Sequence, residues 1–443
     1  MLKASKILVI IFMCLTFTNI LLPDEFVIGI ANLDYRLSAF SMLIRWFNFV
    51  AFLALPVAVF FDRATMKRVS IYFCLPVVII FTCMFGEVIK GYTSDLGTGI
   101  VDIRYLPEWI SILMRNGVFR GILFFATNLI EIAVIVLLIL RDYKILKFNK
   151  TDVLKFISLL PALIISIIPA YALEGIFDTD TGFKFKMFTI AQLVWIIFLI
   201  SEIIVLYNVF KKKSEEDRYI LILILSLSLL VQFNQLFSSL GELTCKRMPF
   251  QLCNIASYIY LFAVLKRNRQ AYIFNATINV VGALIAIIVM DSNTNGILDK
   301  GNIHYIVEHS NILVIPILGL LLGVIEPFKK EEYKVFLKWF SIYFLFVFVL
   351  GTTFNAIYKA TGSDYFKCNY LFMFDSSVAG NLLPFTKPLF DIQINIGPVT
   401  FYPLIAPLIY VVLSGLGMLV FVIFKHAIPK SYAPKDVSVE ELA

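Results

Sequence analysis

The sequence predicts an all-α protein, a polytopic transmembrane helical bundle of about twelve spans with both termini in the cytoplasm. Three observations predict this class. The 443 residues are 60% hydrophobic and only 16% charged, whereas soluble domains are roughly 45–50% apolar and 25% charged. Long apolar segments recur along the whole chain. Basic residues gather in every second loop between them. The net charge of +7 therefore reflects membrane topology and indicates no nucleic-acid partner.

Each predicted span is an apolar segment long enough to cross the bilayer. A helix needs about 20 apolar residues to cross roughly 30 Å of hydrocarbon. We expect spans over residues 5–22, 36–61, 69–87, 117–140, 152–175, 187–210, 219–238, 250–265, 271–290, 308–326, 335–357 and 400–424.

The orientation follows from Lys and Arg. One set of alternate loops holds roughly twice as many basic residues as the opposite set, which has the longer loops, so the first set is predicted to be cytoplasmic. Lys3 and Lys6 precede the first apolar run, and no small-residue cleavage site follows before Pro23. We therefore expect an uncleaved first span in a multi-pass protein of the cell membrane.

A dense charge run over residues 211–218 suggests how the chain is organised. It separates an N-terminal six-span region of unknown role, 1–217, from a second six-span domain, 218–425, and a cytoplasmic tail, 426–443. A Lys-Arg pair precedes both Cys74 and Cys253 at the same distance, which either is chance or indicates an internal duplication. A duplication would favour the pseudosymmetry of a transporter.

Cys253 and His309 are the leading candidates for chemistry. Each opens a span, and the predicted topology places both at the same membrane depth on the outer side. A cysteine there is commonly part of a helix start, and a histidine there is commonly a hydrogen-bonded structural residue. The alternative is a thiolate–imidazolium pair, which is an activated nucleophile.

Other residues have competing interpretations. Cys245 and Cys368 fall in predicted outer loops, where an oxidising exterior permits a disulfide. Glu131 and Glu202 lie deep in predicted spans, and an ionisable residue in a membrane is a candidate functional residue.

One loop partly fits a calcium-binding pattern. Asp291, Asn293, Asn295 and Asp299 supply oxygens at the first, third, fifth and ninth positions, but Asn302 stands where the bidentate Glu belongs. A plain turn has the same composition, so calcium is a weak alternative and we predict no other metal.

The second half of the chain resembles the YwaF / transmembrane protein 164 family of six-span membrane proteins. The resemblance rests on Pro249 and Cys253 at the start of a span and on His309 with Pro316 in another. It rests also on Asn355 at a span end and on a segment that runs Asn369-Tyr370-Leu371-Phe372 before Gly380 and Pro384. Bacterial members of the family often carry histidine two residues before the cysteine. This chain departs from them, because Gln251 stands at that position.

The resemblance implies a cysteine-dependent acyltransferase that moves a fatty acyl chain between membrane lipids without a cofactor. Cys253 and His309 would be catalytic, and the expected substrate-binding or oxyanion residues are Gln251, Asn355, Asn369 and Tyr370. Membrane lipids are then the partners. Two alternatives stay open: a secondary transporter of six plus six spans, and a noncatalytic lipid-binding membrane protein.

Overall fold

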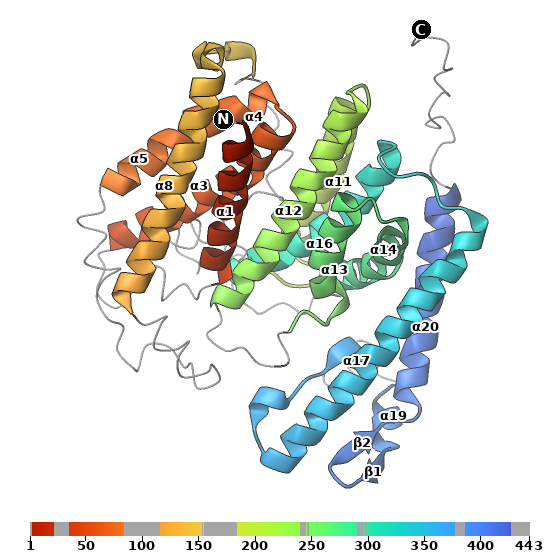
Figure 1. Ribbon diagram of the computed structural model, residues 1–443. Coiled ribbons are helices and arrows are strands. Elements are labelled where there is room, and N and C mark those ends of the chain that lie inside the picture. Colours follow the sequence, from red (N-terminus) through yellow and green to blue (C-terminus); the bar gives the residue numbers. More distant parts are fainter. Residues whose placement is uncertain are drawn as a thin grey trace. The chain divides into compact units, whose positions relative to one another are not determined.

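The computed structural model describes most of the chain as helices (Figure 1). The described residues are 2–21, 35–83, 116–152, 154, 184–239, 245, 248–289, 296, 299–376 and 386–426. Within them the only paired strands are β1 (Ile394–Ile396) and β2 (Val399–Phe401), which form an antiparallel hairpin. The predicted span 152–175 lies almost wholly outside the described residues.

Contacts divide the chain into two compact units. The first unit contains Met1–Phe185, Val231–Leu243 and Asn293–Tyr305, and the second contains Lys186–Leu230, Thr244–Ser292 and Ile306–Ala443. The boundary predicted near residue 218 falls inside the first segment of the second unit. The division into 1–217, 218–425 and 426–443 stays a prediction.

The first unit is built on three long helices. Helix α1 packs against both α8 and α3, and a broken helix made of α4, η2 and α5 packs against α3 and α8. The bounds are α1 (Leu2–Leu21), α3 (Tyr35–Phe60), α4 (Ala64–Val69), η2 (Ser70–Cys74), α5 (Leu75–Cys83), α8 (Gly117–Arg141) and the 3₁₀ turn η3 (Tyr143–Leu146).

The second unit contains most of the remaining helices. Helices α12 and α16 each have one end that belongs to the first unit. The bounds are α11 (Ile190–Phe210), α12 (Glu215–Ser239), α13 (Leu252–Leu265), α14 (Arg269–Phe274), η5 (Asn275–Asn279), α15 (Val280–Ile288), α16 (Lys300–Leu321), η6 (Lys330–Glu332), α17 (Tyr333–Thr361), η7 (Asp364–Phe366), η8 (Tyr370–Phe372), α19 (Lys387–Asp391) and α20 (Ile405–His426).

The helices have the length and composition of an integral membrane protein. Among the described residues, 7 helices are long and apolar enough to cross a membrane: Leu2–Asn19, Gly121–Arg141, Ile190–Phe210, Arg269–Ile288, Gly301–Leu321, Lys330–Thr361 and Ile405–His426. Two shorter apolar helices cover Trp46–Phe60 and Leu252–Leu265. The all-α class and the multi-pass character are confirmed, whereas the count of about twelve spans and the orientation stay predictions.

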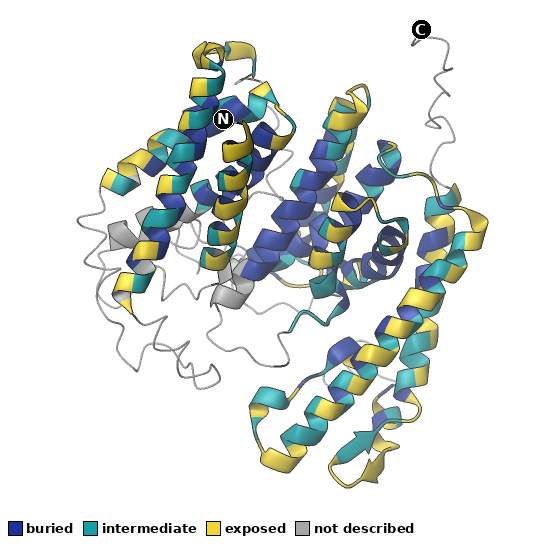
Figure 2. Cartoon of the chain, in the orientation of Figure 1, coloured by how far each residue is buried: buried dark blue, intermediate teal, exposed yellow. Residues whose placement is uncertain are grey.

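Burial follows the pattern expected when lipid is the solvent. Apolar side chains on α11, α17 and α20 are exposed, among them Ile197, Leu345 and Val411 (Figure 2). Helix α16 is by contrast the most buried of the spanning candidates. Because lipid receives apolar side chains at no cost, polar groups collect inside the helix packing instead.

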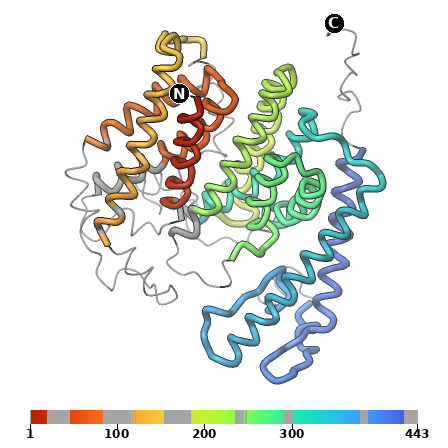
Figure 3. The backbone as a smooth tube through the Cα atoms, viewed as in Figure 1, coloured from red at the N-terminus to blue at the C-terminus, as the bar shows by residue number. Residues whose placement is uncertain are grey.

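Helices α17 and α20 form a long antiparallel pair whose far end carries the β hairpin (Figure 3). The Phe340 and Tyr410 rings stack at 5.5 Å between centroids. Gly417 lies directly against Phe336, at a point where a Cβ would come within 2.4 Å of the ring. Such close approach at small residues is how helices associate without a hydrophobic driving force.

Candidate functional site

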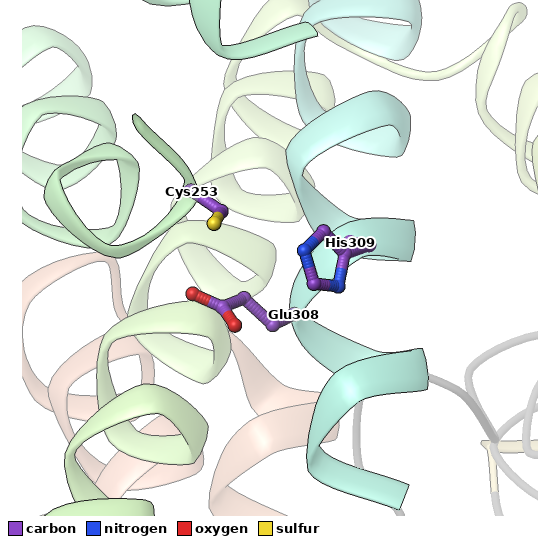
Figure 4. A group of neighbouring side chains, drawn as sticks. All are labelled: Cys253, Glu308 and His309. Carbon is purple, nitrogen blue, oxygen red and sulfur yellow. The ribbon is translucent and has the colours of Figure 1, made fainter. Parts of the chain in front are cut away.

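Cys253, Glu308 and His309 meet inside the second unit. Cys253 comes from the first turn of α13, and the other two come from α16 (Figure 4). The sulfur, a carboxylate oxygen and a ring nitrogen all lie within 4.8 Å of one another. Glu308 and His309 are buried and Cys253 is half-buried. The structure thus brings the two predicted catalytic residues together and adds a carboxylate.

The start of α13 sets the position of Cys253. A turn at Pro249 and Phe250 leads into Gln251, whose backbone is extended and whose carbonyl accepts the first helical bond, from the Ile255 N–H at 3.0 Å. The earlier N–H groups of the first turn have no intrahelical acceptor. The Cys253 and Asn254 N–H groups contact the Cys253 sulfur, so the positive end of the helix faces the thiol.

Pro316 shapes the helix that carries Glu308 and His309. Proline has no N–H, so the carbonyl four residues earlier, that of Ile312, loses its helical donor. The buried Tyr260 hydroxyl of α13 donates to this carbonyl at 3.2 Å, and the Tyr272 hydroxyl donates to the Pro316 carbonyl at 2.9 Å. These two bonds hold α16 against α13 and α14 about one and two turns beyond the site.

A third bond anchors α16 on its other side. The Trp195 indole of α11 donates to the Ser310 hydroxyl at 2.7 Å, directly after His309. Both groups are buried. The helix that presents Glu308 and His309 is therefore fixed by α11, α13 and α14, which favours a preorganised site.

The electrostatics of the three side chains are coupled. A carboxylate beside a thiol disfavours the thiolate, whereas a carboxylate beside an imidazole favours the imidazolium. A proton on His309 would therefore be stabilised by Glu308, and the imidazolium would in turn balance a Cys253 thiolate. A sulfur, an oxygen and a nitrogen at these separations also form a ligand set suited to Zn²⁺.

Gln251 and Asn369 have architectural roles in the structure. The Gln251 amide donates to the Asn369 carbonyl and accepts from the Leu371 N–H, both at 3.1 Å. The side-chain oxygen of Asn369 accepts hydrogen bonds from the backbone N–H groups of Phe374 and Asp375, at 2.9 and 3.1 Å. These bonds tie residues 369–375 to the start of α13. An oxyanion role for either amide stays a prediction.

Asn355 and Tyr370 also bind the chain locally. The Asn355 side chain donates to the Gly351 and Cys368 carbonyls, each at 2.9 Å, and accepts from the Cys368 N–H. The Tyr370 hydroxyl, fully buried, donates to the Cys245 carbonyl. Within the described residues these hydrogen bonds of Asn355 and Tyr370 are to Gly351, Cys368 and Cys245, and none of them is to Cys253 or His309.

Cys245 and Cys368 are free thiols in the structure, so the disulfide considered above is not formed here. Both are buried. Burial, with Cys245 nearby, raises the pKa of the Cys368 thiol to about 12. Burial likewise raises the pKa of Cys245. Pairing of the two under oxidising conditions stays a prediction.

The weak calcium pattern has a structural explanation at Asp299, which is the described member of its four proposed oxygen ligands. The Asp299 carboxylate accepts from the Gly301 and Asn302 N–H groups at 2.9 and 3.3 Å, which caps the start of α16. Asp291, Asn293 and Asn295 lie outside the described residues.

Glu308 is the member of the site that the sequence analysis overlooked. Its neighbour His309 drew attention because histidine is scarce in this chain, with 3 in 443 residues. An acidic residue inside an otherwise apolar span was itself a sufficient signal. Glu131 on α8 and Glu202 on α11, which did draw attention, are also buried.

Comparison with known proteins agrees with the resemblance in the second half. The model of the TMEM164 family matches residues 183–418, which include Cys253, Glu308 and His309. No curated protein and no solved structure matches the chain.

Proposed function

This chain belongs to the TMEM164 family, and we propose that it is a cysteine-dependent acyltransferase of the cell membrane that acts on membrane lipids near the outer leaflet. The observation that carries the proposal is the meeting of the Cys253 sulfur, the His309 ring and the Glu308 carboxylate within 4.8 Å. A nucleophile, a base and a group that orients the base are the parts that acyl transfer requires.

The reaction would proceed in two steps. The Cys253 thiolate, whose proton has moved to His309, attacks the carbonyl carbon of an acyl ester in a donor phospholipid. The ester C–O bond breaks, and the leaving alkoxide takes the proton from His309. In the second step neutral His309 takes the proton of an acceptor lysophospholipid hydroxyl, whose oxygen attacks the thioester. The C–S bond breaks, and the thiolate recovers its proton from His309.

Glu308 would stabilise the positive charge that forms on His309 in each step. A buried carboxylate next to an imidazolium performs this role in catalytic triads. The N–H groups of Cys253 and Asn254, which contact the sulfur and lie in the first turn of α13, are the groups best placed to stabilise the oxyanion, because the carbonyl carbon becomes bonded to that sulfur.

The experiment measures acyl transfer with purified protein in lipid nanodiscs. Isotope-labelled phospholipid serves as donor and a lysophospholipid as acceptor, with mass spectrometry of the lipid products. Cys253→Ala and His309→Ala should each lower the rate at least a hundredfold. Cys253→Ser should leave a residual rate, because a hydroxyl is a poorer nucleophile.

A matched control removes another thiol. Cys83 is exposed on α5, and Cys83→Ser should transfer acyl groups at the wild-type rate. Capture of Cys253 as an acyl thioester, released by hydroxylamine and absent in Cys253→Ala, would identify the nucleophile. Wild-type remodelling of lipids by Cys253→Ala would reject the proposal.

A second candidate function uses the same three side chains as ligands of Zn²⁺. Three protein ligands with one open position are typical of catalytic zinc, which activates a water molecule. The mixed sulfur, oxygen and nitrogen set is the observation that favours it. Stoichiometric zinc in the purified protein, lost in Glu308→Gln, together with activity abolished by a chelator, would select the zinc enzyme. Full activity in metal-free protein would select the cysteine enzyme.

A further inference from the structure

The same run of backbone features occurs twice in the chain. Helix α3 ends at Phe60 and helix α13 ends at Leu265, and each is followed by a three-residue turn, a short α-helix and a π-helical turn. The short helices α4 and α14 have 6 residues each, and the π-helical turns η2 and η5 have 5 each. π-helical turns are rare, so their recurrence in the same context indicates duplicated structure.

The turns themselves match residue by residue. Asp62 has φ of 56° and Arg267, at the corresponding place, has φ of 47°. The next residues, Arg63 and Asn268, are the extended N-caps of α4 and α14. A non-glycine residue with positive φ is uncommon, so the shared position is strong evidence of equivalence.

Hydrogen bonds recur in the same register. The Phe61 N–H bonds to the Val57 carbonyl at 3.1 Å, and its counterpart in α13 joins Lys266 to Phe262 at 3.0 Å. Each short helix also carries an arginine in an ion pair, Arg68 with Asp152 and Arg269 with Glu332, but the two arginines stand at different positions of their helices and do not follow this register.

This register pairs Cys253 with Asn48, not with the Cys74 that the sequence pattern suggested. Asn48 lies on α3, at the same distance before the turn as Cys253 on α13. Each then faces the next long helix of its own unit. Cys253 meets Glu308 and His309 of α16, and the Asn48 side-chain amide donates to the Asn128 side-chain oxygen of α8 at 3.4 Å. The first unit therefore has a counterpart of the candidate site in which an asparagine takes the position of the Cys253 thiol.

The counterpart is a buried polar cluster with unused oxygen atoms. Asn48 is 9% exposed, and Asn128 and Glu131 are 0% exposed. Glu131 follows Asn128 by three residues, so both project from one face of α8. Within the described residues, both Glu131 carboxylate oxygens and the Asn48 side-chain oxygen have no hydrogen-bond partner.

A carboxylate in this position needs a positive partner. An ionised Glu131 away from water costs many kcal/mol unless a proton or a cation neutralises it. The three unused atoms are hard oxygen donors, and carboxylate and amide oxygens inside helix packing are the groups that bind sodium or protons in membrane proteins. The Cys74 thiol also lies near Glu131, and the Asn128 side-chain nitrogen likewise has no hydrogen-bond partner among the described residues.

We propose that Asn48, Asn128 and Glu131 form a binding site for a small monovalent cation, sodium or a proton, in the first half of the chain. The duplicated helices hold the site at the place that carries Cys253, Glu308 and His309 in the second half. The proposal rests on the repeat and on the buried oxygens, and it stands whether or not the second half transfers acyl groups.

The test uses the full chain in lipid nanodiscs. The thermal unfolding midpoint is measured as sodium replaces choline at constant ionic strength, and separately as pH is varied in choline. The wild-type midpoint should rise with sodium, and Glu131→Gln should abolish the rise. If a proton competes with sodium for Glu131, the apparent sodium affinity should increase up to tenfold for each unit rise in pH. A site that takes only protons would show the pH dependence alone, again lost in Glu131→Gln.

Glu308→Gln is the matched control, because it removes the buried carboxylate of the other half. It should keep the sodium response of the wild type, and it should keep the part of the pH response that Glu131→Gln removes. Direct binding of radioactive sodium to wild type and to Asn48→Leu gives a second readout that does not depend on the stability of Glu131→Gln. The proposal is overturned if wild type and Glu131→Gln respond alike, or if Glu308→Gln alone loses the response.

Discussion

Gln251 offers the sharpest test of the structure, because its side chain has two competing roles. The family resemblance suggests a substrate-binding or oxyanion group two residues before Cys253. The structure shows instead an amide that bridges the Asn369 carbonyl and the Leu371 N–H. We expect Gln251→Ala to act mainly on stability, and on activity only in proportion to the loss of folded protein.

The size of the effect follows from the two bonds. Each hydrogen bond contributes about 1 kcal/mol net, so Gln251→Ala should cost about 2 kcal/mol. Gln251→Glu keeps the acceptor for Leu371 but places a carboxylate oxygen against the Asn369 carbonyl, so it should cost at least half as much. A loss of about 2 kcal/mol corresponds to a fall of roughly 4–8 °C in the unfolding midpoint for a unit of 150–250 residues.

The assay follows tryptophan fluorescence during thermal unfolding in detergent, and acyl transfer is measured on the same preparations. The architectural role predicts a lower midpoint with a nearly unchanged rate per folded molecule. An unchanged unfolding midpoint combined with a tenfold lower rate of acyl transfer would refute the architectural role. It would indicate instead that Gln251 stabilises the oxyanion.

Three further predictions concern the fold outside the three site residues. Lys67 bonds to Asp62 and holds the pKa of this exposed carboxyl below its usual range, so its ion pair stabilises the protein above about pH 4 and is lost as pH falls through the lowered pKa. Asp62→Asn, which tolerates the positive φ, should therefore cost up to about 1 kcal/mol at pH 7 and progressively less as pH falls below about 4, measured by unfolding midpoints across pH. Gly417→Ala should cost about 1–3 kcal/mol through overlap with the Phe336 ring, whereas Gly415→Ala, which meets no atom within 4 Å, should be nearly neutral in the same assay. The Cys368 thiol, with its pKa at about 12, should react with maleimide at pH 8 about a thousandfold more slowly than an ordinary thiol, and rapid labelling of this residue would contradict its burial.

Some parts of the site followed from local sequence, and others required contacts between distant segments. Cys253 and His309 each open a span, and two helix starts at similar depth are visible in the residue pattern. The acidic character of Glu308 in an apolar segment was visible in the sequence, but the approach of its carboxylate to Cys253 and His309 required the fold. The amides of Asn355 and Asn369 had the right chemistry for an oxyanion site, but loop folding occupies their polar atoms.

The proposed internal repeat likewise combines a feature visible in the sequence with one visible only in the structure. Pairing Cys253 with Cys74 used matching residue types, which short segments can share by chance. The register proposed above, Cys253 with Asn48, uses backbone features instead, since a π-helical turn and a positive φ at Asp62 and Arg267 are set by geometry.

Composition alone determined that this chain is a helical membrane protein, because the balance of apolar and charged residues decides which solvent its surface can face. Residue patterns near span ends also carried the family resemblance. Only the tertiary structure decided which polar groups meet, since the partners Cys253 and His309, and likewise Asn48 and Asn128, come from helices far apart in sequence. Burial makes these contacts chemically important, because a charged group inside helix packing is costly without a partner. Folding determines which partner lies within reach.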